Sequence, residues 1–309
     1  MSVPRWQRAT AAFRGGVSLL AVLTVTACGN SADVNGPDTQ PDATEADRDA
    51  AQLRMVGGLG GVSVVASAVN RSLEVVGIAQ TSQGESHGFL WSEGNTRDLG
   101  TLGGGWSTAA DINDWGQVTG TSLTAGGEAR AYFWSDGNMY DLGTLGGGES
   151  HGVAVNNRGE VAGYSTTGDG EMHAFLWSHG RMRDLGTLGG SGSFSVAAND
   201  HGEVVGRSIT TSGDAQAFRW SDGELRELAP EPTASSSAVA VSEEGHVLVN
   251  SRLSGRGRAY VWSDGMLAQL ESPDGATTVA SDINASGDVV GQSTMATGPT
   301  LPVLWREGR

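Results

Sequence analysis

Six tryptophans recur along this 309-residue chain at an almost constant interval, and this repeat limits the folds open to the chain more than any other feature. They are Trp91, Trp134, Trp177, Trp220, Trp262 and Trp305, and successive members are 43, 43, 43, 42 and 43 residues apart. Each opens a turn with a glycine at its fourth position, such as WSEG at 91–94 and WREG at 305–308. Internal repeats of about 20–50 residues are typical of solenoids, propellers and related arrays.

A second turn lies upstream of most of these tryptophans, and the short runs between turns have the composition of strands. The second turn has sequences such as NDWG at 113–116, in which Asn opens the turn and Gly accepts a positive φ. The runs between turns, such as 117–122 and 130–134, are rich in Val, Thr, Tyr and Phe. With 48 Gly and only 17% charged residues, the composition also argues against long surface helices. We therefore predict an all-β fold with four strands in each repeat.

Four antiparallel strands in about 40–45 residues is the size of a β-propeller blade. The sixth copy stops one strand short, while the segment 53–61 matches 182–190, so the chain starts with the strand that it lacks at its end. We predict a six-bladed β-propeller over residues 53–309, closed by an N-terminal strand at about 53–57 that completes the C-terminal blade. In a solenoid, the first strand would not need to supply the strand that is missing from the last repeat. A seven-bladed ring that borrows another segment is the main alternative.

Most of the repeated residues are expected to be structural. Two positions before each tryptophan lies a bulky residue on the same strand face, and we expect both to pack between blades rather than to form a stacking platform. The innermost strand has a small residue at one position of every repeat, which fits strands that converge near the axis. These small residues are Ala66, Ala109, Gly152, Ser195, Ala238 and Ala280.

The repeat resembles a known family. The stretch HAFLWSHGRMRDLGTLGG at 173–190 and its partner INDWGQVTG at 112–120 are similar to the HAF repeat family of extracellular bacterial proteins. The resemblance covers essentially all of 53–309 and implies secretion and a propeller-like fold, but no activity. The fifth and sixth copies depart from the pattern, with ELAPEPT at 227–233 and QLESPDG at 269–275 in place of DLGTLGG.

The first residues have the features of a targeting segment. Three arginines precede the apolar stretch at 17–27, which is too short for a stable membrane anchor but long enough for a signal-peptide core. The stretch ends at Cys28, the only cysteine, and TVTAC at 24–28 resembles the bacterial lipobox. We predict a lipoprotein signal peptide at 1–27 and lipid attachment to Cys28. An ordinary signal peptide with an incidental cysteine is the alternative.

Residues 28–52 are predicted to be a disordered acidic tether, because they carry six acidic residues and almost no bulky apolar ones. The protein is therefore expected to be exported and anchored in the cell envelope through the lipid on Cys28. Gly29, rather than Asp, follows the cysteine, which by resemblance favours the outer membrane if the source is Gram-negative.

Charge and cysteine content exclude several classes of function. The formal net charge is −16 and the chain contains no Lys, so it lacks the basic stripe that nucleic-acid binding requires. A single cysteine excludes a disulfide framework and Cys-rich metal sites. We predict a monomer without a cofactor; calcium is conceivable, but no motif supports it.

Candidate binding residues lie where the repeats differ, since positions that the fold requires should be alike in every blade. Just after the glycine pair of each repeat, on the rim formed by the longer connections, most repeats have small residues. Trp106, Glu149, His151 and Phe194 interrupt this series and offer an aromatic wall with an acid and an imidazole. We predict a ligand site there, near the mouth of the central channel. Drift of surface residues is the alternative explanation.

Two carboxylates, Asp111 and Asp282, occupy a position of the inner strand that is Ala in the other repeats. Facing a channel, they would be suited to bind a cation or to act as an acid–base pair. Alternatively, each accepts a hydrogen bond from a neighbouring backbone N–H or contacts water, and this reading is favoured. No EF-hand, HExxH or GxSxG motif is present, and no catalytic or metal-binding residue is assigned.

These features predict a surface-tethered extracytoplasmic β-propeller that acts as a binding or interaction module for an unidentified protein or glycan. A hydrolase or lyase acting on glycans or peptides at the channel mouth is the first alternative. A structural envelope protein without a small ligand is the second.

Overall fold

The computed structural model describes residues 55–228, 234–272, 277–295 and 298–306, and these form strands and turns. The predicted signal peptide, Cys28 and the acidic tether lie outside the described residues, so export and lipid attachment stay predictions. Within the described ranges, no helix has the length and apolar character needed to span a membrane.

The first half of the described chain forms three antiparallel four-stranded units in sequence order, and a single parallel bridge between Ser86 and Trp106 joins the first two into one sheet. Unit 1 contains β1 (Gly60–Val69), β2 (Val75–Thr81), β3 (Ser86–Ser92) and β4 (Asn95–Asp98). Unit 2 contains β5 (Gly103–Ile112), β6 (Val118–Thr124), β7 (Ala129–Ser135) and β8 (Asn138–Asp141). Unit 3 contains β9 (Gly146–Val155), β10 (Val161–Thr167), β11 (Met172–Ser178) and β12 (Arg181–Asp184).

The second half repeats this order, and the last unit has three strands among the residues described. Unit 4 contains β13 (Gly189–Ala198), β14 (Val204–Thr210), β15 (Ala215–Ser221) and β16 (Glu224–Glu227). Unit 5 contains β17 (Ser235–Val241), β18 (Val247–Leu253), β19 (Arg256–Ser263) and β20 (Met266–Gln269). Unit 6 contains β21 (Thr277–Ile283), β22 (Val289–Thr294) and β23 (Thr300–Trp305).

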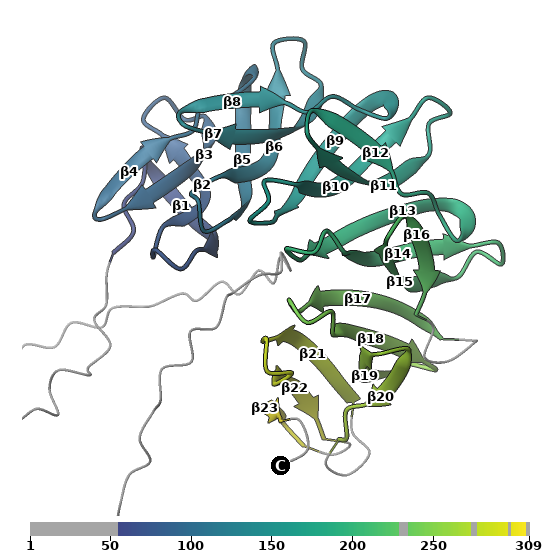
Figure 1. Cartoon of the computed structure of the whole chain (residues 1–309). Coiled ribbons are helices and arrows are strands. Elements are labelled where there is room, and N and C mark those ends of the chain that lie inside the picture. Colours follow the sequence, from purple (N-terminus) through teal and green to yellow (C-terminus); the bar gives the residue numbers. More distant parts are fainter. Residues whose placement is uncertain (1–54, 229–233, 273–276, 296–297, 307–309) are drawn as a thin grey trace, which may run out of the picture.

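The units follow one another around an arc, and units 1 and 6 do not meet (Figure 1). Within the described ranges β23 pairs with β22 alone, and residues 55–58 are not part of a strand. Of the predicted closing strand at about 53–57, residues 55–57 are therefore not in a strand. Residues 53 and 54 lie outside the described residues. The all-β fold and its four-stranded unit are confirmed, whereas closure of the ring stays a prediction.

Glycine turns set the strand boundaries, as the sequence predicts. In the turn between β3 and β4, Glu93 and Gly94 both have positive φ, at 49° and 88°. The same pair of left-handed residues recurs at the equivalent turn of units 2 to 5. Two consecutive positive-φ residues form the two-residue hairpin turn that matches strand twist, which explains the repeated Trp-Ser-x-Gly sequence.

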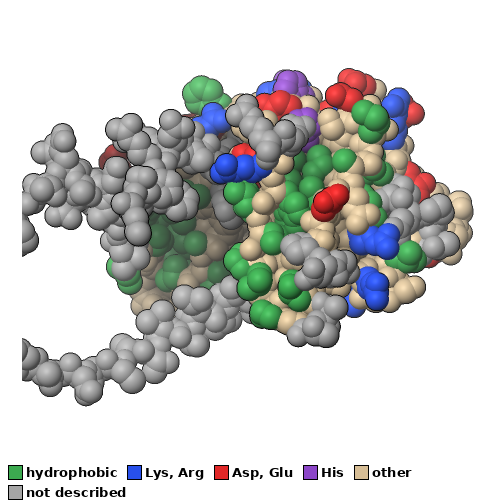
Figure 2. Space-filling view, turned by 90° about the horizontal axis from the view of Figure 1, so that it is seen from below, with side chains coloured by type: hydrophobic (Ala, Val, Ile, Leu, Met, Phe, Trp, Pro, Cys, Tyr) green, Lys and Arg blue, Asp and Glu red, His purple; other side chains and the backbone are tan. Residues whose placement is uncertain are grey.

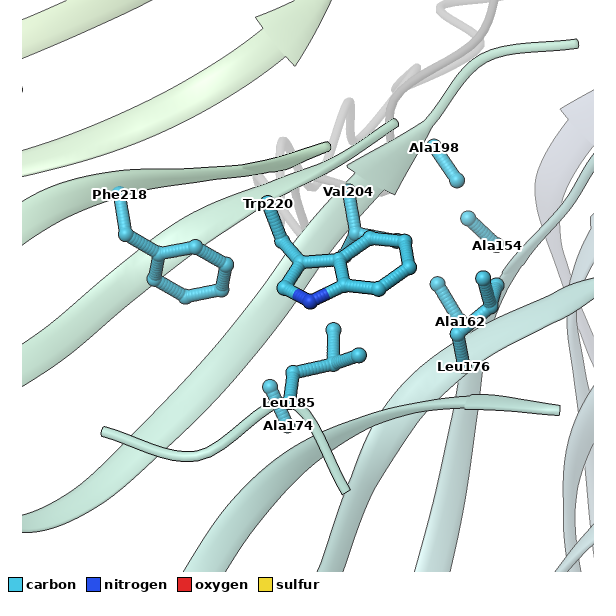
Figure 3. Packing of buried hydrophobic residues seen from close by; sticks show 9 residues of the cluster. All are labelled: Ala154, Ala162, Ala174, Leu176, Leu185, Ala198, Val204, Phe218 and Trp220. Atoms are coloured by element: carbon cyan, nitrogen blue, oxygen red, sulfur yellow. The ribbon is translucent and has the colours of Figure 1, made fainter. Parts of the chain in front are cut away.

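The hydrophobic core is divided among the contacts between adjacent units. In the cluster of Figure 3, Ala162 and Leu176 of unit 3 pack with Val204, Phe218 and Trp220 of unit 4. The position two residues before the repeat tryptophan is buried in units 1 to 5, which confirms the predicted packing. The small inner-strand residues of units 2 to 6, among them Ala109 and Ala238, are also buried, whereas Ala66 of unit 1 is exposed.

Two sets of hydrogen bonds join neighbouring units. In the first, a hydroxyl of the inner strand in each of units 2 to 6 accepts a backbone N–H from the third strand of the preceding unit. These bonds run from Gly88 to Ser107, Ala131 to Ser150, Ala174 to Ser193, Ala217 to Ser236 and Ala259 to Thr278, at 2.8–3.1 Å. We call this set the serine ladder.

In the second set, which we call the asparagine ladder, the side-chain amide of one unit donates to a backbone carbonyl of the next. The bonds run from Asn70 to Asn113, Asn113 to Asn156, Asn156 to Asn199 and Asn199 to Ser242, at 2.8–3.0 Å. The ladder stops at Ser242, whose side chain has no amide to donate.

Candidate functional site

The connections between strands lie on two opposite rims. The turns between the first and second strands and between the third and fourth strands form one, which we call the hairpin rim. The loops between the second and third strands and the crossovers between units form the other, the crossover rim. The sequence prediction placed its candidate site on the crossover rim.

Three of the predicted or neighbouring side chains form a continuous row across units 3 and 4 near the crossover rim, which we call the aromatic row. His151 in β9 stacks on Tyr164 in β10, with ring centroids 4.8 Å apart. Tyr164 in turn meets the ring of Phe194 in β13 edge-on, at a centroid distance of 5.4 Å. The guanidinium of Arg207 in β14 lies over the other side of this row, 5.2 Å from the Phe194 ring centroid.

At the end of the row that faces unit 2, His151 makes a polar contact with that unit. Thr121 Oγ1 lies 3.3 Å from His151 Nδ1. Because the tautomer of a histidine follows from its partners, this contact places a hydroxyl against the imidazole without requiring it to be charged.

Burial dominates the ionisation of the row. It lowers the pKa of His151 below its ordinary value, although Glu149 acts in the opposite direction. It also raises the pKa of the Tyr164 hydroxyl, and the nearby negative charge of Glu149 adds to this shift. At neutral pH the row is therefore an uncharged aromatic surface with one cation, Arg207, at its end.

The structure brings together some of the predicted site residues but not all. A carboxylate oxygen of Glu149 lies 3.9 Å from His151 Nε2, so these two are neighbours, and Phe194 joins them through Tyr164. Trp106 in β5 is partly buried, and among the described residues no ring contact links it to the row. The predicted site is thus a contiguous surface over units 3 and 4, with Trp106 outside it.

The two inner-strand carboxylates are separate and have different surroundings. Asp111 is only 6% exposed, and its Oδ2 accepts the backbone N–H of Val155 in the next unit at 2.9 Å. Asp282 Oδ1 accepts the N–H of its own neighbour Ile283 at 2.9 Å, and burial raises the pKa of Asp282 to about 6. No contact joins the two carboxylates, which lie in units 2 and 6. For Asp111 this geometry matches the favoured reading, a hydrogen bond to a neighbouring backbone N–H.

The described ranges contain no group of three or more His, Cys, Asp or Glu arranged to hold a metal ion. The side chains that the row presents are aromatic rings, a hydroxyl and a guanidinium. Such groups contact the apolar face or the polar edge of a ligand.

Sequence reasoning missed Tyr164 and Arg207, although a signal for both was available. They occupy the same position of the second strand, which is different in every repeat: Ile78, Thr121, Tyr164, Arg207, Asn250 and Gln292. The rule used for the inner strand, that function lies where repeats differ, would have found them in the second strand. Cross-strand pairing of His151 with Tyr164 and of Phe194 with Arg207 joins the two variable positions.

The fold is similar to known β-propellers. The β-propeller domain of the Trilobed protease from Pyrococcus furiosus, described as having an open velcro topology, aligns with a TM-score of 0.54 and 9% identity over 80% of this chain and 82% of that one. A prolyl endopeptidase aligns with a TM-score of 0.57 and 13% identity over 78% of this chain and 40% of that one. The acylaminoacyl peptidase of Pyrococcus horikoshii gives 0.50 and 12% over 78% and 43%.

The sequence matches no known family model and no curated protein. This chain covers less than half of the two peptidases, and the identities to all three structures are low. The likeness therefore shows the fold alone: the chain has an all-β, propeller-like architecture.

Proposed function

We propose that this protein is an exported, lipid-anchored binding module, built on a closed six-unit β-propeller that presents its crossover rim to a protein or glycan. The lipobox-like sequence ending at Cys28 and the resemblance to HAF repeats support export and anchoring in the cell envelope, in the outer membrane if the source is Gram-negative. The likeness to solved β-propellers supports the architecture.

Side chains that are buried elsewhere are exposed at the two ends of the arc, which supports closure. Val290 in β22 is 46% exposed, whereas the residues at its position in units 1 to 5 are fully buried: Val76, Thr119, Ala162, Val205 and Leu248. Val64 in β1 is 38% exposed, whereas the serine-ladder residues at its position are buried. Figure 2, seen from the side where unit 6 lies in Figure 1, shows hydrophobic side chains gathered on that face. Contact between units 6 and 1 would bury both valines.

The segment before β1 packs against unit 1 in the same way as the crossover from one unit packs against the next. Val56 and Leu59 pack against the cluster of Phe89 and Trp91. In the next unit, Leu99 and Leu102 of the crossover pack in the same way around Trp134. Leu59 also forms the isolated bridge to Thr81 that Leu102 forms to Thr124. By the repeat, the residues just before Val56 correspond to a fourth strand, and the described residues of unit 6 include no fourth strand.

A matched pair of substitutions at the two ends also supports closure. The serine ladder needs a backbone N–H on the third strand and a hydroxyl on the next inner strand. The donor position of unit 6 is Pro302, which has no N–H, and the acceptor position of unit 1 is Val64, which has no hydroxyl. Both departures from the ladder therefore fall at one interface, the one that closure would form.

The binding function rests on one observation, the aromatic row. It runs through two units and ends in a cation, and it is made from positions at which the other repeats have different residues. A surface that only packed units together would use the same residues in each unit, as the serine ladder does. Rigid strands carry every member of the row, which favours binding by a preformed surface.

The test is thermal unfolding of the full chain against a panel of neutral and acidic oligosaccharides and cell-wall peptides. A ligand at 100 times its Kd stabilises the folded state by about 2.7 kcal/mol, and a domain of this size shifts by roughly 2–4 °C per kcal/mol. We expect at least one member of the panel to raise the melting temperature, and Tyr164→Ala to abolish the shift.

Trp115→Ala is the matched control, because Trp115 is an exposed aromatic residue of the hairpin rim. This variant should keep the ligand-induced shift. If no member of the panel shifts the melting temperature, or if Tyr164→Ala leaves the shift intact, the row is not a binding surface.

A further inference from the structure

A second feature of the crossover rim extends the site beyond the aromatic row. A pocket of about 420 Å³ lies over units 4 to 6, lined by Arg207, Arg252, Ser235, Ser237, Asn250 and Thr277 among others. This volume falls within the roughly 300–1,000 Å³ that small-molecule sites occupy. We call it the arginine pocket.

The charge of the arginine pocket is opposite to that of the chain. The protein has 35 acidic and 19 basic residues, yet among the described residues two arginines and no acidic residue line this pocket. Neither guanidinium has an ion-pair partner among the described residues. A pair of uncompensated arginines attracts an anion, and the planar guanidinium matches a carboxylate with two parallel hydrogen bonds.

Arg207 is held in place before any ligand arrives. Its guanidinium rests against the ring of Phe194, the last aromatic member of the row. This cation–π contact limits the number of conformations that Arg207 must give up on binding. The row and the arginine pocket therefore share a residue and form one continuous surface.

The rest of the lining offers hydroxyl groups. Ser235 and Thr277 begin the inner strands of units 5 and 6, and neither hydroxyl makes a hydrogen bond with another described residue. A hydroxyl donates one hydrogen bond and accepts others, so these groups suit a ligand that itself carries several hydroxyls.

The interval between Trp220 and Trp262 is 42 residues rather than 43, and the missing residue belongs to a loop beside this pocket. Four residues separate β2 from β3, but only Ser254 and Gly255 separate β18 from β19; β19 is one residue longer than β3, so the repeat is shorter by one residue. Both have positive φ, at 50° and 83°, as a tight two-residue turn requires. The shortened hairpin of unit 5 borders the arginine pocket, whose lining includes Gly255.

We propose that the arginine pocket binds an acidic sugar, with the carboxylate of a uronic acid held by Arg207 and Arg252 and its hydroxyls by the serines and threonine of the wall. This inference rests on the binding function proposed above and names its ligand class. The ligand is a short saccharide end rather than a long polyanion, since the net charge of −16 repels an extended acidic polymer.

The probe is trigalacturonate, a linear trimer of galacturonic acid, titrated into the full chain by calorimetry at 150 mM salt. The corresponding neutral galactose trimer is the ligand control. Arg207→Gln with Arg252→Gln should weaken trigalacturonate binding by at least about tenfold, because each change removes hydrogen bonds to a charged group. Arg71→Gln is the matched protein control, since Arg71 is an exposed arginine at the hairpin rim.

Three results together support the assignment. Trigalacturonate binds saturably and the neutral trimer does not. The double variant loses this binding, and Arg71→Gln keeps it. Binding that survives in the double variant overturns the site. Inorganic phosphate binding as tightly as trigalacturonate would make this a general anion site and overturn the sugar class. If trigalacturonate fails but another ligand binds in a Tyr164-dependent manner, the acidic-sugar inference is wrong while the proposed binding function holds.

Discussion

At the scale of single residues, the same change in a repeat has different meanings in different units. Asp111 and Asp282 both replace an alanine of the inner strand, but only Asp111 bonds to a neighbouring unit in the structure. The sequence could predict that both were unusual and could name the backbone hydrogen bond as the favoured role. It could not predict which N–H was within reach, because that depends on how closely adjacent units pack.

Asp111→Ala should therefore lower the free energy of unfolding. The substitution leaves the buried N–H of Val155 without its acceptor, which costs about 1–3 kcal/mol. Urea unfolding at pH 7 measures the change. Asp169→Ala, at an exposed loop carboxylate, should stay within about 0.5 kcal/mol of wild type. Unchanged stability together with a lost response to calcium would instead restore the cation-binding interpretation of Asp111.

At the scale of elements, turn glycines and bounded apolar runs were enough to predict four strands per repeat. The contacts between units were harder to predict, since the serine and asparagine ladders pair residues in different repeats. Tyr164 and Arg207 were missed for a related reason: they belong to the second strand and join the site only through pairing with His151 and Phe194.

The break in the asparagine ladder gives a stabilising substitution. In Ser242→Asn, the new amide would donate to the carbonyl of Asn284, as Asn199 donates to that of Ser242. Its Oδ1 would still accept the N–H of His246, which Ser242 Oγ accepts at 3.2 Å. We expect a gain of about 0.5–1.5 kcal/mol in urea unfolding.

Asn156→Ala is the converse variant in the intact part of the ladder. It removes the bond to the carbonyl of Asn199 and those from the N–H groups of Arg158 and Glu160. A Ser242→Asn variant no more stable than wild type, beside a destabilised Asn156→Ala, would mean that unit 6 is not held in the register of the other units.

At the scale of the whole molecule, units 1 and 6 lie apart in the structure, and we propose that they meet in a closed ring. The sequence predicts closure because the chain starts with the strand that its last repeat lacks. The exposed valines and the matched substitutions Pro302 and Val64 at the two ends of the arc support the same proposal. Closure joins residues more than two hundred positions apart, so no local pattern determines its geometry.

A double-mutant cycle on Pro302→Ala and Val64→Ser tests closure. In a closed ring the two changes together restore a donor and an acceptor, so the double variant should exceed the sum of the singles by about 0.5–1.5 kcal/mol. Val64→Ser with Pro299→Ala is the control cycle, which should be additive. Additivity in both cycles would instead favour the arc of Figure 1, in which units 1 and 6 do not meet.

The pH dependence of stability at Asp282 gives a second test. In the arc, burial raises the pKa of Asp282 from 3.8 to about 6. Between these two pH values the folded state binds more protons than the unfolded state, so stability falls as the pH rises from one to the other. Closure would supply the N–H of Val69, as Val155 supplies one to Asp111, and would stabilise the charged carboxylate. We expect closure, and hence that Asp282→Asn lowers stability at pH 7 in urea unfolding. An Asp282→Asn variant that is more stable than wild type at pH 7 but equal to it at pH 4 would contradict closure.

The two ladders connect each unit only to its immediate neighbours. A row of units held in this way behaves as a one-dimensional chain, in which an end unit detaches by breaking a single interface. In a ring, the first unit to detach must break two interfaces at once. Closure would therefore make unfolding cooperative and slow even though no unit is itself strengthened.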